Sequence, residues 1–557
     1  MRKSRRPNFS DLLSDPVLLR WYLRNRRGRL PAREDSAAAA SGWPTIVGTA
    51  ACGDGFADLA VGAPGEALDL SLAGATITLS PSAPDILFRQ RNNWPMLHGF
   101  GWLAGQPETP GAEIPGEWVA ALWRAWMDRH ATARPNDIAW RADVAAARAV
   151  NLLDYARRRG LPGPRRQSLA VLADHAPAIA ASVAAGADAA VQGHGLYRLG
   201  VELGLSEAAK LGLDLLTGEA RQRIRPSGMR GDGSTGGHLR LVWAYADSWL
   251  AARRHDRPES GVLRAILCRL ASVLPVLVLP GGLPDIGEAP AECPAGFLLG
   301  VLGGERMAQG WTGRLTDDER GVLAEALAES SLHDLDRLRG DGWLRFDNAG
   351  WSGLWHAAGW IDPDGHQDLG SFELHYGGVP IFVDAGTSPP VDGASYATAL
   401  VHNGLTLDGL EPCPRDRPVY DEAFKRSVAG IAPDLRPEFD GVSLCSHRYD
   451  GLGGPREMRR RWRFAEGGFV LDDLINGTGR YRLRRRLITP LEVTAVDGAV
   501  VLSSGRLRLS VSAEGPPVLR PLRRWTAAGV EQPLTIIEFG TGRTNLPWRG
   551  RITVAGG

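Results

Sequence analysis

The stretch GHQDLGSFELHYGGVPIFVDAGT, residues 365–387, decides how the rest of this 557-residue chain is interpreted. Apolar and polar residues alternate over residues 371–376, which is the period of a half-buried β-strand. The Gly377-Gly378 pair predicts a tight hairpin turn, because such turns need positive φ angles that glycine adopts readily. A return strand then runs to Asp384. The stretch therefore predicts a β-hairpin with one apolar and one polar face.

Metal-binding side chains are concentrated around this hairpin. His366, Asp368, Asp384 and His402 lie on one compact β unit that ends in VHNGLTLDG, residues 401–409. Imidazole and carboxylate groups are common ligands of divalent metals. If the hairpin ran straight, His366 would lie about 16 Å beyond the start of the first strand. A shared metal therefore requires residues 365–370 to bend back, which glycines at both ends of that segment permit.

Together, the hairpin and the HNGLTLDG segment resemble the signature of the heparinase II/III-like polysaccharide lyases. That signature reads roughly H-x-H-x-D, then S-F-E-L, G-G and V-D-x-G-T, and later H-N-T with V-D-G. The resemblance implies that one divalent metal, zinc or alternatively calcium, is bound by His366, Asp384 and His402. The first His of H-x-H, which in the family often serves in catalysis, is Asp364 here.

Composition excludes several other classes of protein. Apolar residues make up 44% of the chain and charged residues 23%, with a net charge of +1, which argues against a globally basic nucleic-acid binder. The five Cys residues are scattered without a CxxC pair, so neither a zinc ribbon nor a disulfide framework is predicted. Charged residues interrupt the N-terminal apolar region, and no apolar run reaches about 18 residues. We therefore expect a soluble, cytoplasmic protein without a membrane span.

Periodicity predicts an α+β multidomain chain. Residues 1–90 are expected to form a short helix, a linker and a small β-rich segment. From residue 91 to about 335, helical signals recur every 20 to 30 residues, at 166–187, 190–203, 206–224, 237–255, 260–275, 294–303 and 316–333. Residues 336–557 alternate in the manner of strands, separated by Gly-rich turns, which predicts an antiparallel β-sandwich. The family resemblance implies that the helices form an (α/α) toroid.

The first candidate site in the helical half is VQGHGLYRLGVELG, residues 191–204. It resembles the family segment in which an Asn-His pair opens a helix that lines the cleft. His194 matches that His as a catalytic candidate. Gly193 stands at the Asn position, so Gln192 is the residue we expect to replace it. A lone His at a helix start is otherwise more often a cap or a solvated group.

The second candidate site is RPSGMRGDGSTGGHLRLVWAYADSW, residues 225–249. In the family this segment carries the Tyr that transfers the proton, and Gly237 occupies that position here. His238 is the adjacent residue, and its unperturbed pKa of about 6.5 suits proton transfer near neutrality. The alternative is that His238 only caps a helix. The candidate substrate-binding residues are Tyr197, Trp94 and Asp364.

Two functions of different classes follow. The first is a lyase that cleaves an acidic, uronic-acid-containing polysaccharide or oligosaccharide by β-elimination, in a metal-supported cleft between the toroid and the sandwich. The second is a non-catalytic relative that binds polysaccharide during assembly or secretion and keeps the metal for structure. Gly237 and Asp364 favour the second function, whereas the retained His residues favour the first. A third hypothesis, a glycoside hydrolase, needs two carboxylates across one cleft, for which Asp232 and Asp364 are available.

Overall fold

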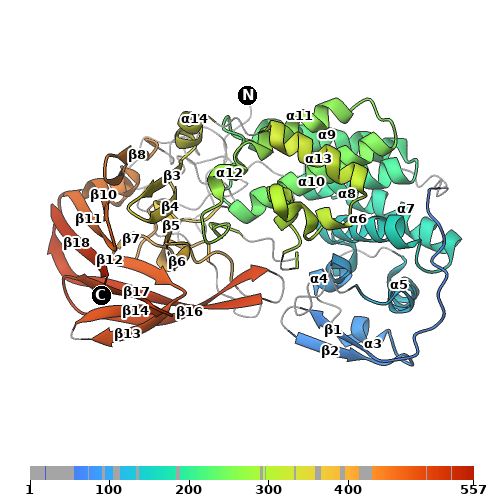
Figure 1. Ribbon diagram of the computed structural model, residues 1–557, viewed down its shortest axis with the longest axis horizontal. Coiled ribbons are helices and arrows are strands. Elements are labelled where there is room, and N and C mark those ends of the chain that lie inside the picture. The colour runs from blue at the N-terminus through green and yellow to red at the C-terminus, as the bar shows by residue number, and fades with distance from the viewer. Residues whose placement is uncertain are drawn as a thin grey trace.

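The computed structural model shows a helical half and a strand-rich half side by side (Figure 1). It describes residues 19, 55–72, 75–90, 94–104, 113–132, 137–182, 189–288, 293–294, 296–330, 334–357, 365–388, 396–412, 430–496, 498–527 and 530–556. Apart from Leu19, the helix expected near the N-terminus lies outside these residues. The predicted boundaries at residues 90 and 335 stay a prediction.

The helical half has antiparallel helices stacked in a ring, which confirms the expected toroid. Its main helices are α5 (Gly116–His130), α6 (Ala142–Arg159), α7 (Arg165–Ala180), α8 (Ala189–Glu202), α9 (Ser206–Arg223), α10 (Thr235–Arg254), α11 (Ser260–Ala271), α12 (Leu274–Leu277), α13 (Asp317–Glu329) and α14 (Leu335–Gly340). The predicted helix at 294–303 is instead the 3₁₀ turn η5 (Leu299–Leu302). Gly296 and Gly303 on either side of it have positive φ angles, which an α-helix does not accommodate.

A small β-rich unit precedes the ring. Strands β1 (Leu68–Leu72) and β2 (Ala75–Leu79) pair antiparallel, and the short helices α3 (Ile86–Gln90) and α4 (Pro95–His98) follow them. Their apolar side chains join the core of α5, where Trp123 and Trp126 stack with ring centroids 5.3 Å apart. This part of the chain therefore shares one core with the first helices of the toroid.

Helices α8 and α9 pack backbone to backbone. A Cβ at Gly200 would lie 2.2 Å from the backbone nitrogen of Ala209, and one at Gly212 would lie 2.4 Å from that of Tyr197. No side chain larger than glycine fits at either contact without moving a helix, because backbone atoms cannot yield as flexible side chains do. This close approach fixes the position of α8, which carries His194.

The strand-rich half contains three antiparallel sheets, which confirms the expected β-sandwich. Its strands are β3 (Trp343–Asn348), β4 (Trp351–His356), β5 (Ser371–Tyr376), β6 (Val379–Phe382), β7 (Leu405–Leu407), β8 (Asp434–Glu438), β9 (Gly441–Ser446), β10 (Pro455–Ala465), β11 (Gly468–Gly477), β12 (Arg480–Thr489), β13 (Glu492–Val496), β14 (Ala499–Ser504), β15 (Leu507–Ala513), β16 (Pro517–Ala527), β17 (Val530–Asn545) and β18 (Trp548–Gly556). The sheet orders are β13-β14-β15-β18-β11-β10-β9-β8, β16-β17-β12-β7 and β3-β4-β5-β6. The largest hydrophobic cluster of this half consists of aromatic and aliphatic residues from these sheets, and a smaller one lies around Val383 and Ile488.

The predicted hairpin is β5–β6, and its turn is formed by Gly377 and Gly378, with φ angles of 56° and 83°. The register shifts by one residue between Leu374 and His375. Both faces of β5 are buried rather than one. The polar face lies against the toroid segment 281–288, where Nδ1 of His375 accepts a hydrogen bond from the Gly281 N–H at 3.1 Å. The polar side chains of the hairpin therefore line the contact between the two halves.

Helices α11 and α12 together give one segment, Ser260–Leu277, that is long and apolar enough to cross a membrane by length and composition alone. Its mean hydropathy is 1.6, and 44% of it is buried within the fold. Leu263, Leu267 and Leu270 belong to the toroid core. A core helix of a globular protein meets the same criteria, so this single segment is weak evidence for a membrane span.

The buried Arg524 on β16 joins the two halves. Its guanidinium donates to Glu373 on β5 at 3.1 Å and to the Asp384 carbonyl at 2.9 Å, and it lies 3.5 Å from Asp285 of the toroid segment. Burial opposes the charge of Arg524, but the carboxylates of Asp285 and Glu373 raise its pKa. The buried cation is thus matched by carboxylates from both halves of the molecule.

We predict that Arg524→Met lowers the free energy of unfolding by about 3 kcal/mol, because it leaves buried carboxylates without their cation. Arg523→Met, on the same strand but with an exposed side chain paired to Glu531, should change it by less than about 1 kcal/mol. Urea denaturation followed by Trp fluorescence measures both changes. Equal midpoints for the two variants would contradict the role of Arg524.

Candidate functional site

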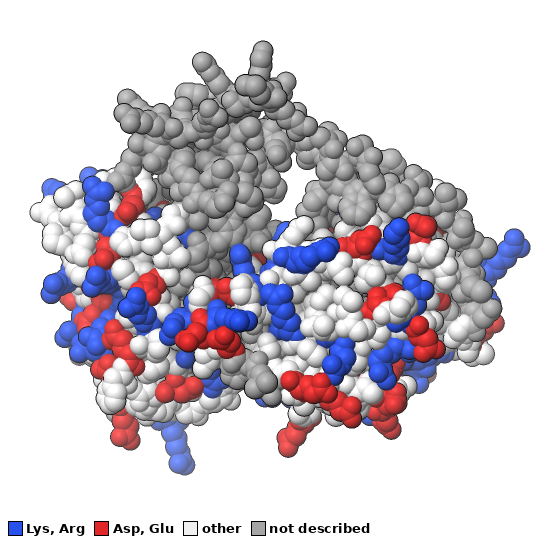
Figure 2. Space-filling model, turned by 90° about the horizontal axis from the view of Figure 1, so that it is seen from above, with Lys and Arg blue, Asp and Glu red and all other residues white. Residues whose placement is uncertain are grey.

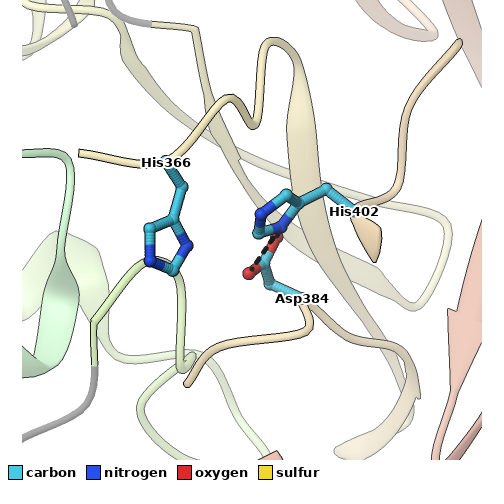
Figure 3. Close-up of side chains that lie close together, drawn as sticks. All are labelled: His366, Asp384 and His402. Carbon is cyan, nitrogen blue, oxygen red and sulfur yellow. Dashed lines mark hydrogen bonds and ion pairs between the residues drawn. The ribbon is translucent and has the colours of Figure 1, made fainter. Parts of the chain in front are cut away.

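The three predicted metal ligands converge in the structure, although they come from separate segments (Figure 3). His366 precedes β5, Asp384 follows β6, and His402 follows the 3₁₀ turn η8 (Ala399–Val401). Each is at most 4% exposed, and their ligand atoms all lie within 4.8 Å of one another. Gly370, with a φ angle of 69°, permits the bend that brings His366 back toward the hairpin.

His402 is held at both ring nitrogens. Nδ1 lies 2.9 Å from Oδ2 of Asp384, and Nε2–H donates to the Tyr396 carbonyl at 2.7 Å. Burial alone would lower the pKa of His402, but the Asp384 carboxylate raises it to about 9. Asp384 also accepts hydrogen bonds from the Ser371 hydroxyl and from the Gly386 N–H. Without a metal, the protonated imidazole of His402 is therefore the counter-charge of Asp384.

The surroundings of His366 fit a metal ligand. Its Nε2 lies 3.0 Å from Oε1 of Glu288, whereas its buried Nδ1 has no hydrogen-bond partner among the described residues. Metal-bound His residues usually donate their other N–H to a carboxylate or a carbonyl. Glu288 and the Tyr396 carbonyl supply these two acceptors, so the Nδ1 atoms of His366 and His402 are available with Asp384 to bind a divalent metal.

A separate cavity of about 230 Å³ lies within the toroid. It is lined by residues of α6, α8 and α10 and of the segments around α4 and Phe297, none of which belongs to the strand-rich half. Its polar lining consists of three arginines, one aspartate, one asparagine and His194, namely Arg141, Arg230, Arg240, Asp143, Asn151 and His194. Basic side chains thus outnumber acidic ones in the lining, although Arg141 is paired with Asp143 and Nε of Arg230 lies 3.1 Å from Asp232. On the face seen in Figure 2, by contrast, basic and acidic side chains are intermixed over the described residues.

His194 on α8 reaches this cavity and is anchored from behind. Its Nε2 lies 2.6 Å from Oδ2 of Asp247 on α10, and Arg198 donates to the same carboxylate oxygen. Burial lowers the pKa of His194, and Asp247 partly opposes that shift. Burial alone would raise the pKa of Asp247, but Arg198 and His194 hold it well below its usual range. Neutral His194 therefore carries its proton on Nε2, which leaves the lone pair on Nδ1.

The structure does not bring the other two catalytic candidates to the cavity. His238 is fully buried in α10, where Nε2–H donates to the Leu270 carbonyl at 3.0 Å and Nδ1 accepts from the Arg230 N–H at 3.3 Å. Burial lowers its pKa to about 4, so we assign His238 a structural role. Gln192 is about 200° from His194 around α8, at 100° per residue, and is not part of the cavity lining.

The structure describes two of the three substrate-binding candidates. Tyr197 is buried, and its hydroxyl donates to Glu259 at 2.9 Å. Trp94 precedes α4 and packs on the core, next to Pro95 and Met96, which line the cavity. Asp364 lies outside the described residues.

The position expected for the family Tyr lies in the cavity wall. Gly237 lines the cavity, and a Cβ there would lie 3.0 Å from Nη1 of Arg230 and 2.8 Å from the hydroxyl of Ser234. The guanidinium of Arg230 thus occupies the space that a side chain at residue 237 would enter. No tyrosine lies among the described residues that line the cavity.

Sequence reasoning missed Asp247, the three cavity arginines and Glu288. One signal for Asp247 was available, since it is an acidic residue within the otherwise apolar run LVWAYADSWL, residues 241–250. Buried carboxylates are rarely unpaired, so its position predicts a buried cation or His nearby. The arginines gave no comparable signal, because arginine is abundant throughout this chain.

Residues 332–533 match the family described as Heparinase II/III-like, C-terminal. The strand-rich half is therefore similar to the C-terminal domain of the heparinase II/III-like proteins. This confirms the resemblance that began with the hairpin sequence. A crystal structure of heparinase III superposes with a TM-score of 0.53 at 14% identity, covering 79% of this chain and 73% of that one. At that identity the likeness shows that the two proteins share a fold.

Two further solved structures are similar. A heparan sulfate lyase from Pedobacter heparinus, studied as a mutant, has a TM-score of 0.46 at 13% identity and covers 86% of this chain and 75% of that one. The chondroitin AC lyase of Streptomyces coelicolor A3, in complex with chondroitin sulphate, has a TM-score of 0.47 at 12% identity and covers 98% and 83%. No curated protein matches the chain.

We predict that His402→Ala lowers the zinc content of the purified protein by one equivalent per chain. The substitution removes one of three ligands and leaves Asp384 without its cation. His255→Ala, which alters a partly exposed His of the toroid, should retain that equivalent, and circular dichroism checks that both variants fold. Elemental analysis of the zinc content after dialysis tests whether His402 is a ligand. Equal content in His402→Ala and wild type would exclude His402 as a ligand.

Proposed function

We propose that this protein is a polysaccharide lyase that cleaves an acidic, uronic-acid-containing polysaccharide by β-elimination. The observation that carries the proposal is His194, a neutral His on an arginine-lined cavity with a buried Asp behind it. The heparinase III fold and the heparinase II/III-like domain support the same reaction class. Elimination from a uronate requires a base for the C5 proton, a neutralised carboxylate and a proton for the departing oxygen.

The cavity arginines supply the neutralisation. Removing the proton beside a carboxylate builds a second negative charge, which is unfavourable unless cations or hydrogen-bond donors stabilise it. Arg240 is on α10, Arg230 lies just before that helix, and Arg141 precedes α6. Bidentate contacts between guanidinium and carboxylate groups would both orient the uronate and offset its charge. This division of roles makes the arginines substrate-binding residues.

His194 supplies the proton transfer. Its Nδ1 lone pair would accept the C5 proton, and the resulting imidazolium would be stabilised by Asp247 at Nε2. The same proton can then pass to the departing glycosidic oxygen, while the electrons of the C5–H bond form the new double bond. Asp247 does not touch substrate in this scheme. It is a positioning residue that fixes the tautomer and the orientation of the ring.

One proton-transfer group implies one stereochemical course. A single side chain reaches only one face of the sugar ring, so the C5 proton and the O4 leaving group must lie on that same face. In a 4-linked glucuronate these groups are on the same face, and in an iduronate they are on opposite faces. We therefore propose that the protein acts at glucuronate and not at iduronate.

The metal would serve the architecture of the strand-rich half. His366, Asp384 and His402 would hold it, and a divalent cation bound there would supply the positive charge that Asp384 and Glu288 share. These residues do not line the toroid cavity. Glu288 links them to the toroid, because its backbone carbonyl accepts from Ser234 at the start of α10. We propose that the metal keeps this segment in place.

Incubation with glucuronate-containing and iduronate-containing polymers tests the reaction class. We expect new ultraviolet absorbance from an unsaturated uronate with the former and none with the latter. His194→Gln should reduce the rate by at least about 100-fold, the usual contribution of general acid–base catalysis. New reducing ends without absorbance would instead mean hydrolysis.

Asp247→Asn should lower kcat by about 100-fold or more while changing KM little, because tautomer control is lost but the arginines remain. In the wild type, kcat/KM should fall as the pH drops below 6.5, since His194 with its lowered pKa must be neutral to act. The variant should move that midpoint lower still, because the carboxylate that raises the pKa of His194 is gone. An unchanged pH profile would contradict the role of Asp247.

A non-catalytic polysaccharide-binding protein is the second candidate. The observation that favours it is Gly237, which leaves the cavity wall without the tyrosine that the family resemblance implies. Under this alternative, acidic oligosaccharides bind the cavity without any product. Arg240→Ala would then weaken binding, and His194→Gln would leave binding unchanged.

A further inference from the structure

A second group of metal-binding side chains lies on the strand-rich half, away from the His366 cluster. Cys445 is on β9, His447 follows that strand, and Glu457 is on β10. Their ligand atoms all lie within 4.8 Å of one another, and all three residues are half-buried. Cys445 pairs across the strands with Arg459, two residues from Glu457, so Cys445 and Glu457 share one face of the sheet.

His447 is already oriented as a ligand. Its Nδ1–H donates to the Arg456 carbonyl at 2.8 Å, which is the backbone contact that fixes the tautomer of metal-bound His residues. A carbonyl can only accept, so Nδ1 must carry the proton. The lone pair of neutral His447 is therefore on Nε2, the nitrogen left for a metal.

Glu457 is held in place from two sides. Its Oε1 accepts from Asn476 on β11 at 3.0 Å and lies 2.7 Å from Nε of Arg459. The Cys445 thiol lies beside this carboxylate, within 4.8 Å of it. A metal would replace the thiol proton and compete with Arg459 for the carboxylate. Arg459 is 62% exposed, so its side chain has room to leave.

This group is separate from the His366 cluster because successive side chains of β10 point to opposite faces of the sheet. Residues 458, 460, 462 and 464 face the core, whereas 457, 459, 461 and 463 face outward. Arg460, on the core side, donates to the Asn403 carbonyl next to His402. Cys445, His447 and Glu457 lie on the opposite, solvent side of the same strands.

We propose that Cys445, His447 and Glu457 bind a second divalent metal of the zinc class, with a fourth position open to water or to a ligand from solution. Thiolate and imidazole ligands favour zinc and cobalt over calcium and magnesium, which prefer oxygen. Three protein ligands with an open position are the arrangement of exchangeable or reactive zinc sites. This inference does not depend on lyase activity.

Cobalt binding to the full-length protein tests the proposal, because a cobalt–thiolate bond gives an ultraviolet charge-transfer band. The His366 cluster has no thiol, so a metal bound there cannot give this band. We expect the band in wild type and in His402→Ala, and its loss in Cys445→Ser. Cys268→Ser, which removes another half-buried thiol on α11, should retain it. No band in wild type at saturating cobalt, or an undiminished band in Cys445→Ser, would overturn the site.

Two more variants keep the test decisive if Cys445→Ser fails to fold. His447→Gln leaves the thiol in place and should weaken cobalt binding at least about tenfold. Arg459→Ala should strengthen it by about fivefold, the effect of removing one unit charge about 4 Å away in water. Arg461→Ala, an exposed change on the same face of β10 whose partner is Glu438, should leave affinity unchanged. Weaker binding in Arg459→Ala, or unchanged binding in His447→Gln, would contradict the ligand set.

Discussion

The buried carboxylate of Asp384 is the constraint on which the centre of this molecule depends. A fully buried charge is strongly unfavourable unless it is paired and hydrogen-bonded. Asp384 meets that requirement with the His402 imidazolium, the Ser371 hydroxyl and the Gly386 N–H. These partners come from the start of β5, the end of β6 and the segment before β7. Satisfying one carboxylate therefore fixes the relative positions of three segments that are distant in sequence.

The requirement that buried charges be paired also applies to the contact between the two halves. The polar face of β5 carries Glu373 and His375, which are buried because the toroid segment 281–288 covers them. That segment returns hydrogen bonds from its own backbone, at Gly281 to His375 and at Asp285 to Glu373. Arg524 balances the carboxylates that gather there. Most polar groups in this contact are paired, although Nε2 of His375 has no hydrogen-bond partner among the described residues, so the contact holds the halves in one arrangement rather than merely excluding water.

Paired burial also shapes the toroid site. Asp247 is buried together with Arg198, so its charge is balanced, and its remaining hydrogen-bonding capacity is used on His194. Glu202, bound by Arg198, Arg254 and His255, extends the network to the surface, and its pKa is lowered to about 2 although burial opposes that shift. The result is a rigid support behind one ring nitrogen. Rigid placement of a His beside a cavity is what proton transfer requires.

Local sequence predicted most of the elements, and the family resemblance pointed to the residues His366, Asp384 and His402 that converge in the structure. The period of helices and strands is a local property, so the ring, the sandwich and the β5–β6 turn follow from it. Asp384 and His366 were recognisable because their motif is contiguous, and His402 because its segment follows closely. The expected polar face of β5 was also correct as a pattern. Its burial was not predicted, because the toroid segment that covers it lies about 90 residues earlier in the chain.

Only the tertiary structure decided which groups share the cavity. His194 and His238 are equally suited by chemistry, and the sequence favoured His238 as the replacement for the missing Tyr because it is adjacent to Gly237. The fold places His194 on the cavity in front of Asp247 and encloses His238 between two backbone partners. Gln192 lies away from the cavity because residues two positions apart on a helix, such as Gln192 and His194, point to nearly opposite sides. The sequence by itself determined which reactive side chains the chain carries. Tertiary packing decided that Nδ1 of His194 keeps its lone pair beside the cavity arginines. Burial and pairing depend on residues that are distant in sequence, so local sequence could not show this.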